Sequence, residues 1–269
     1  KKVKPDLIAM WLWFWDIKMT APGYLIPLTR KLSPQAKILL FTDDVHSKRE
    51  RQIAQQFKNL KAYNHYQRRS VYMLSQERQS YAAADTVVSI TEADRMDIVG
   101  MDAARPDHVY SMRFILSPWD ELKRDEQIKD FEGRSGLIFV GNGENPTNIH
   151  AMKWYVDSVA NELWKGLPGV KCYVVGQEWD LFARNNPKSS KYLIFLGALS
   201  TSEMNKAIDS AMVFVAPIRA STGINTKNVL ALSRGIPLVT TPAGAVGMCD
   251  GCDSVILFNP MDPFESQDN

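Results

Sequence analysis

Residues 212–241, MVFVAPIRASTGINTKNVLALSRGIPLVTT, contain two apolar or β-branched runs on either side of a polar loop and a helix-like segment. The runs at residues 212–218 and 237–241 are nearly continuous, which indicates strands that are buried on both faces. The segment between them, residues 223–233, is predicted to be the helix that joins two parallel strands. This order of strand, helix and strand is typical of sheets that carry helices on their faces.

The same alternation continues along the 269-residue chain, which is long enough for one large or two ordinary domains. In the first half, the predicted strands are residues 7–15, 37–42, 86–90 and 108–114, and the predicted helices are residues 21–32, 47–84 and 91–100. The stretch 47–84 is long and charged, and a break could divide it. In the second half, the predicted strands are residues 136–140, 170–175, 192–196, 212–218, 237–241 and 254–258, and the predicted helices are residues 148–167, 201–211 and 223–233. The fold class is therefore expected to be α/β with parallel sheets.

A charged, irregular segment at residues 119–135 separates the two series and is predicted to be a linker. We therefore expect two Rossmann-like domains, at residues 1–118 and 136–269. The first domain is expected to be incomplete, because it lacks an opening strand with a glycine-rich turn. The chain also begins without an initiator methionine, which suggests a piece of a longer protein.

The composition shows no strong bias toward a charged partner. The formal net charge is +2 at pH 7 and the lysines and arginines are scattered, so we expect no nucleic-acid partner. The apolar run at residues 7–15 is too short to cross a bilayer and is predicted to be a buried strand, so no transmembrane segment is expected. Trp11, Trp13 and Trp15 share one face of that strand, which favours a core position over a platform for stacking sugars.

The three cysteines are Cys172, Cys249 and Cys252, and the last two form a single C-x-x-C. A disulfide framework needs more cysteines, and a structural zinc site needs four ligands. We therefore expect reduced, structurally minor thiols, with a zinc or redox site as the less favoured alternative. As a separate expectation, the protein has no metal site and no bound cofactor. A cytoplasmic or other reducing compartment is favoured.

Two loops at the predicted carboxyl ends of strands are candidates for binding an anion. In the first loop, Gly141, Asn142 and Gly143 precede a helix, so glycine would let the backbone approach a ligand that also faces the free amides of the helix. The loop does not match G-x-G-x-x-G, so the dinucleotide-binding fingerprint is absent. A turn that simply needs glycine is the alternative interpretation.

The second loop joins Arg219, Ser221, Thr222 and Gly223 to a helix that carries Lys227. The free amides at the start of the helix would face the carboxyl edge of the sheet, where open α/β sheets bind ligands. The guanidinium and ammonium groups add positive charge that suits a diphosphate. In the alternative interpretation, Ser221 and Thr222 only cap the helix.

A third candidate site is the sequence Thr-Asp-Asp-Val-His-Ser at residues 42–47, which follows a predicted strand. Asp44 and His46 are the candidate catalytic residues, since a carboxylate and an imidazole can act as a base or bind sugar hydroxyls. In the alternative interpretation, Asp43 or Asp44 starts a turn and Ser47 caps a helix.

Residues 213–248 resemble the nucleotide-binding domain of group 1 (family 4) glycosyltransferases, which have the GT-B fold. Two further strands of that domain are similar to Phe139-Val-Gly141 and Phe195-Leu-Gly197. Residues 42–46 and 84–95 look like the other domain of these enzymes, which binds the acceptor. The resemblance implies metal-independent transfer of a sugar from a nucleotide-sugar donor, with retention of configuration, to a glycan, lipid or protein acceptor.

The resemblance also implies roles for particular residues. The donor diphosphate would lie at Ser221-Thr222-Gly223 with Lys227 nearby, the base would lie near Gly197, and the transferred sugar would face His46. Two glutamates that the family uses to hold the donor are replaced here by Thr222 and Leu230. An inactive glycosyltransferase-like domain that serves as a scaffold or binds a protein partner is therefore the alternative hypothesis. A nucleotide-sugar epimerase is disfavoured, because neither Tyr-x-x-x-Lys nor G-x-G-x-x-G is present.

Overall fold

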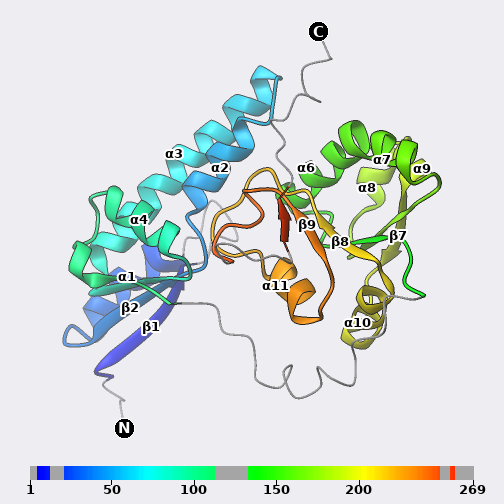
Figure 1. Cartoon of the computed structure of the whole chain (residues 1–269). Helices are drawn as coiled ribbons and strands as arrows, with labels where there is room; N and C mark the ends of the chain where they lie inside the picture. Colours follow the sequence, from blue (N-terminus) through cyan, green and yellow to red (C-terminus); the bar gives the residue numbers. More distant parts are fainter. Residues whose placement is uncertain (1–4, 13–20, 113–132, 249–254, 258–269) are drawn as a thin grey trace. The chain divides into compact units, whose positions relative to one another are not determined.

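The computed structural model describes residues 5–12, 21–112, 133–248 and 255–257 (Figure 1). The chain divides into two compact units: residues 1–115 with 222–224 form unit 1, and residues 116–221 with 225–269 form unit 2. Each unit contains one parallel sheet, so the predicted α/β fold class is confirmed. Most of the predicted linker, Cys249 and Cys252 lie outside the described residues.

Unit 1 is built on a four-stranded parallel sheet whose strands follow one another in chain order. The strands are β1 (Leu7–Leu12), β2 (Lys37–Thr42), β3 (Thr86–Ser89) and β4 (Val109–Ser111). The helices are α1 (Ala21–Leu32), α2 (His46–Ala54), α3 (Leu60–Ala83), α4 (Glu92–Gly100) and the short 3-10 helix η1 (Pro106–His108). The predicted strands and helices of this half are therefore confirmed within the described residues.

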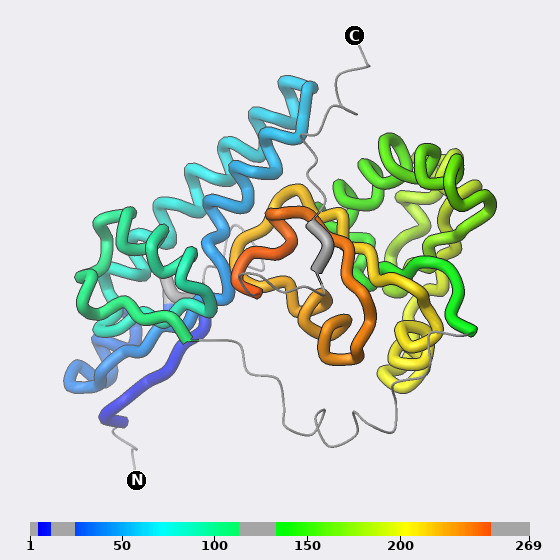
Figure 2. Tube along the Cα trace, in the orientation of Figure 1, coloured from blue at the N-terminus to red at the C-terminus, as the bar shows by residue number. Residues whose placement is uncertain are grey.

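The helical stretch predicted over residues 47–84 consists of two helices, and Figure 2 shows α2 and α3 side by side. The second helix begins after Asn59, whose side-chain oxygen accepts hydrogen bonds from the amides of Lys61 (2.9 Å) and Ala62 (3.2 Å). These two amides lack partners within the helix, so the asparagine fixes the place where α3 starts.

The prediction that β1 is a buried strand is wrong. Leu7 is 59% exposed and Trp11 is 55% exposed. The physical reason is that β1 is an edge strand, which among the described residues pairs only with β2. Trp11 stacks on Phe41 of β2 with ring centroids 4.7 Å apart, so it contacts a neighbouring strand without being enclosed. Trp13 and Trp15 lie outside the described residues.

Unit 2 is built on a six-stranded parallel sheet with the order β10-β9-β8-β5-β6-β7. The strands are β5 (Leu137–Val140), β6 (Cys172–Val175), β7 (Leu193–Gly197), β8 (Val213–Ala216), β9 (Leu238–Thr240) and β10 (Val255–Leu257). The chain runs outward from β5 to β7, returns to the other side of β5 as β8, and continues to β10. This is the strand order of a doubly wound dinucleotide-binding domain, in which the direction of winding reverses between the first and fourth strands.

The helices of unit 2 differ from the predicted helices in three places. The helices are α6 (Pro146–Trp154), a π-helical segment η3 (Tyr155–Val159), α7 (Ala160–Gly166), α8 (Asp180–Asn185), α9 (Ser189–Tyr192), α10 (Thr201–Ser210) and α11 (Thr226–Ser233). The predicted helix 148–167 contains the π-helical segment, and α8 and α9 are additional short helices. Helix α11 begins three residues later than predicted, with Asn225 as its N-cap, so Ser221 and Thr222 do not cap it.

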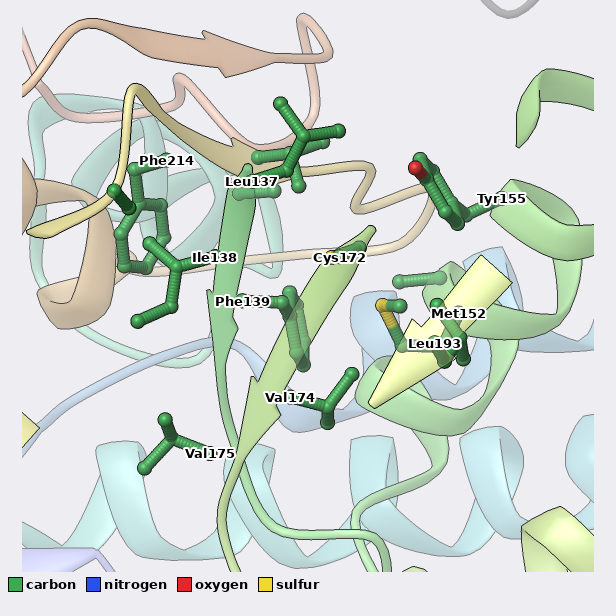
Figure 3. Packing of buried hydrophobic residues seen from close by; sticks show 14 of the residues in the cluster. Leu137, Ile138, Phe139, Met152, Tyr155, Cys172, Val174, Val175, Leu193 and Phe214 are labelled. Atoms are coloured by element: carbon green, nitrogen blue, oxygen red, sulfur yellow. The ribbon is translucent and has the colours of Figure 1, made fainter. Parts of the chain in front are cut away.

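The core of unit 2 consists of apolar side chains from the central strands and the helices that cover them (Figure 3). Phe139, Val174 and Phe214 have no exposed surface. Cys172 is enclosed in the same core, and burial raises the pKa of its thiol well above the usual value. The thiolate is therefore disfavoured, and Cys172 acts as a small apolar side chain.

Candidate functional site

In unit 2, the carboxyl ends of β5 and β8 mark the place where the direction of winding reverses. Ligands of open α/β sheets bind in the crevice outside the carboxyl ends of the strands at this reversal. The loops that leave these two strands, residues 141–145 and 217–225, are the two loops that the sequence predicts to bind an anion. The topology therefore places both predicted loops at one position of the sheet.

The first loop is closely packed within unit 2. The amide of Gly141 donates to Val175 O (2.8 Å), and the amide of Gly143 donates to Gln177 O (2.9 Å). A Cβ added at Gly143 would lie 2.2 Å from Glu178 O, which no side chain could tolerate. Protein packing thus accounts for the glycines, and the role of this loop in donor binding stays a prediction.

Asn148, in the first turn of α6, connects the first loop to Lys227 in α11. The side-chain amide Nδ2 of Asn148 donates to Asn142 O (2.9 Å), and its Oδ1 accepts from Lys227 Nζ (2.5 Å). The ammonium also lies 4.7 Å from the centroid of the Phe139 ring, within the range of a cation–π interaction. Helix α6, through Asn148, and strand β5, through Phe139, therefore hold the Lys227 ammonium at the carboxyl end of β5.

The Lys227 ammonium has no carboxylate in ion-pair contact among the residues that the structure describes. Burial lowers the pKa of Lys227 to about 8, and among the described residues no charge opposes this effect. Removing a cation from water is costly unless an anion or several hydrogen bonds compensate for the lost hydration. Lys227 is therefore a cation whose surroundings favour the arrival of an anion.

Arg219 lies in the loop that follows β8, at the same edge of the sheet. The central guanidinium carbon lies 5.6 Å from the ring centroid of Trp154, the last residue of α6, and Trp154 is 8% exposed. Burial, followed by the charges of Arg219 and Lys153, lowers the pKa of His150. His150 is therefore mainly neutral at neutral pH, and the positive charge beside Trp154 is that of Arg219.

The structure reveals two asparagines that the sequence analysis did not identify as site residues. Asn225 Nδ2 donates to Ser221 Oγ (2.9 Å) and Gly244 O (3.2 Å), and Asn228 Nδ2 donates to Gly244 O (2.9 Å). Asn228 has no exposed surface. Together they connect the start of α11 to the loop that follows β9. A polar residue at a buried position of a predicted helix is the signal that could have identified Asn228.

The remaining predicted donor-binding residues have the following positions. Gly197, at the end of β7, and Gly223 have φ angles of 71° and 69°, in the left-handed region that favours glycine. A Cβ at Gly197 would meet no atom within 4 Å, so this glycine is explained by its backbone angle rather than by crowding. Ser221 and Thr222 are both buried.

Unit 1 contains the two predicted catalytic residues, which lie together after β2. His46 Nδ1 is 3.1 Å from Asp44 Oδ1 and 3.6 Å from Glu77 Oε1. Asp44 also forms an ion pair with Arg49. An imidazole beside two carboxylates is held in one orientation. This geometry suits acid–base chemistry or hydrogen bonding to hydroxyl groups.

Glu77 is the member of this cluster that the sequence analysis missed. It has no exposed surface, and its carboxylate accepts a hydrogen bond from the amide of Ser47 (3.3 Å). The available signal is its position on α3, because Ser70, Met73 and Tyr81 are also buried and lie on the same helical face. A charged residue on a buried helical face requires partners, and His46 and Ser47 are those partners.

In residues 5–12, 21–112, 133–248 and 255–257, no group of three or more His, Cys, Asp or Glu side chains could hold a metal ion. Among the same residues, no helix has both the length and the apolar character needed to span a membrane.

Comparison with known proteins finds a family model that is similar to the second half of the chain. The family described as Glycosyl transferases group 1 matches residues 134–267. An uncharacterized 44.6 kDa protein in the cps region of Klebsiella pneumoniae is 23% identical over 116 residues. That match covers 41% of this chain and 30% of the Klebsiella protein.

Solved structures extend the likeness to both units. Anabaena HepE, in complex with UDP and glucose, matches 95% of this chain with a TM-score of 0.61 and 13% identity. A UDP-forming trehalose-phosphate synthase from Burkholderia xenovorans matches 96% with a TM-score of 0.65 and 13% identity. A sucrose-phosphate synthase from Thermosynechococcus elongatus matches 96% with a TM-score of 0.66 and 12% identity. The predicted GT-B fold is confirmed, and the chain spans 64%, 63% and 61% of these three proteins, respectively.

Proposed function

Since residues 134–267 match the family of group 1 glycosyl transferases, we propose that the protein transfers a sugar from a nucleotide-sugar donor to an acceptor. The donor diphosphate would bind at the carboxyl ends of β5 and β8, near Lys227 and Arg219. The nucleotide sugar is a co-substrate, and the proposal requires no other cofactor and no metal ion.

The observation that carries this proposal is the environment of Lys227. Its ammonium is held at the reversal of the sheet by Asn148 and has no carboxylate partner among the described residues. A donor diphosphate carries the negative charge that would compensate for the burial of this cation. Arg219 lies in the loop that follows the neighbouring strand β8. Its guanidinium group is a second cation, and its planar arrangement of donors suits phosphate oxygens.

In the proposed reaction, the bond between the anomeric carbon and the diphosphate oxygen breaks. A bond from the acceptor oxygen to the anomeric carbon forms on the same face of the sugar, and configuration is retained. The acceptor proton passes to the leaving phosphate oxygen. His46 and Asp44 stay predicted catalytic residues. Lys227 and Arg219 would stabilise the negative charge that develops on the leaving diphosphate, which is the task that a metal ion performs in other transferases.

UDP is the first nucleotide to test, because HepE was solved with UDP and the trehalose-phosphate synthase is UDP-forming. Calorimetric titration of the full chain with UDP, UDP-glucose and other nucleotide sugars tests the proposal. We expect binding that Lys227→Ala abolishes and Arg219→Ala weakens. Lys165→Ala is the matched control, since Lys165 lies in unit 2, has a side chain that is 68% exposed and pairs with Glu162.

A second candidate function is a glycosyltransferase-like scaffold that has lost catalysis. It is favoured by Leu230, which packs against the core of unit 2 where the family resemblance leads one to expect a glutamate that holds the ribose. Losing hydrogen bonds to a charged group costs on the order of 2 kcal/mol each, or more than tenfold in affinity. The scaffold function requires no donor binding. Absence of binding to the whole nucleotide-sugar panel up to millimolar concentration would therefore favour it and would overturn the transferase proposal.

A further inference from the structure

Asn148 occupies a position between the first loop and Lys227 that allows one orientation of its side chain. It is 4% exposed, and a Cβ added at Gly141 would lie 2.6 Å from its Nδ2. Asn142 O can only accept a hydrogen bond, so Nδ2 must face it. Oδ1 must then face the ammonium of Lys227, which can only donate.

The chemistry of Asn148 matters because aspartate has nearly the same shape. An aspartate here would place a carboxylate against the ammonium of Lys227 and would neutralise it. The amide instead accepts one hydrogen bond and carries no net charge. Lys227 is thereby fixed in place while its positive charge stays available to another group.

We propose that Asn148 is a positioning residue that holds the Lys227 ammonium at the carboxyl end of β5 and leaves its charge for the donor diphosphate. This inference rests on the proposed function. Asn148 acts through Lys227 and does not need to touch the donor. Its neutrality makes unit 2 selective for anionic ligands over nucleosides that lack phosphate.

Two variants of the full chain, Asn148→Asp and Asn148→Ala, test this role in opposite directions. The titration of Lys227 is followed by NMR of isotope-labelled lysine side chains, with the resonance assigned from Lys227→Gln. The wild-type midpoint is expected near the pKa of about 8 that burial gives Lys227. Asn148→Asp raises the midpoint because a carboxylate stabilises the charged form, and Asn148→Ala lowers it because the acceptor is lost.

The second readout is the affinity for inorganic pyrophosphate, UDP and uridine, measured by calorimetry at neutral pH. Asn148→Asp is expected to weaken pyrophosphate and UDP binding about tenfold or more, because the ammonium is already paired. Asn148→Ala is expected to weaken them about threefold to tenfold. Uridine binding is expected to stay unchanged in both variants.

Asn161→Asp is the matched control, because Asn161 is exposed on α7 in the same unit and the substitution makes the same change in charge. It should move neither the Lys227 midpoint nor the affinity for pyrophosphate. Circular dichroism melting checks that each variant is folded, and two variants with opposite expected shifts keep the test decisive if one of them unfolds.

The outcomes separate this inference from the proposed function. If the wild-type chain binds neither pyrophosphate nor UDP, the proposed function is refuted. The claim that the Lys227 charge is available to a diphosphate is then refuted as well. If the wild-type chain binds both but the variants leave the Lys227 midpoint and the affinities unchanged, the role of Asn148 is overturned and the proposed function stands.

Discussion

Replacing Lys227 with methionine removes the buried charge while keeping a long, flexible side chain. In the wild-type protein, burial lowers the pKa of Lys227 from its ordinary value of 10.5 to about 8. The unfolded chain therefore holds this proton up to about 10.5, whereas the folded chain releases it near 8. Between these values the unfolded state binds more protons, so the free energy of unfolding rises with pH.

The size of this effect follows from the shift in pKa. A difference of about 2.5 units corresponds to about 3 kcal/mol, at about 1.4 kcal/mol per unit. The cost of burying the charge is fully present at neutral pH and is relieved as the pH rises from about 8 to about 10.5. The free energy of unfolding of the wild-type protein, relative to Lys227→Met, should therefore rise by about 3 kcal/mol over this range.

Urea denaturation of both proteins at several pH values between neutral and about 10.5 measures this difference. Other titrating groups contribute equally to the two proteins and cancel, as does the pH-independent loss of the hydrogen bond to Asn148. A difference that stays constant with pH would refute the reasoning, because it would mean that Lys227 keeps its ordinary pKa in the folded state. The same variant should not bind UDP. At neutral pH, Lys227→Met is therefore expected to remove the cost of burying the charge and at the same time to lose ligand binding.

Three further predictions concern other residues. Trp154→Leu should weaken UDP binding about threefold to tenfold through loss of the cation–π contact with Arg219, with uridine binding unchanged in the same calorimetric titration. Burial raises the pKa of Asp94 to about 6, so the folded state holds this proton more tightly than the unfolded state. The free energy of unfolding of the wild-type protein, relative to Asp94→Asn, should fall by about 3 kcal/mol as the pH rises from about 4 through about 6. Urea denaturation of both proteins over this pH range measures the difference, and a difference in free energy that does not change with pH would contradict the prediction. His46→Ala and Asp44→Asn should lower kcat by about a hundredfold or more while leaving the Kd for UDP unchanged, and unaltered turnover in both variants would remove these residues from the proposed chemistry.

The strands of unit 2 were predictable because their signal is local. Apolar runs such as residues 136–140 and 212–218 indicate strands buried on both faces, and alternation with helices indicates a parallel sheet. The loops after β5 and β8 could be identified as candidate sites for the same reason, since each follows its strand directly. That both loops lie where the direction of winding reverses could not be predicted, because this depends on the strand order, which the structure supplies.

Features that depend on distant partners were not predictable. Asn148 and Lys227 are 79 positions apart, and nothing near either residue indicates their hydrogen bond. The exposure of β1 was mispredicted because an apolar run looks the same at the edge and in the centre of a sheet. The start of α11 was placed too early because Ser221 and Thr222 are good capping residues, whereas the chain uses Asn225.

Phosphorus NMR of UDP-glucose mixed with the full chain tests the central claim most directly, because it observes the diphosphate itself. The account predicts that both phosphate resonances shift or broaden with the wild-type protein and return to their free values with Lys227→Met. Resonances that stay unchanged with the wild-type protein, or that change equally with Lys227→Met, would contradict the claim that this cation binds the donor diphosphate.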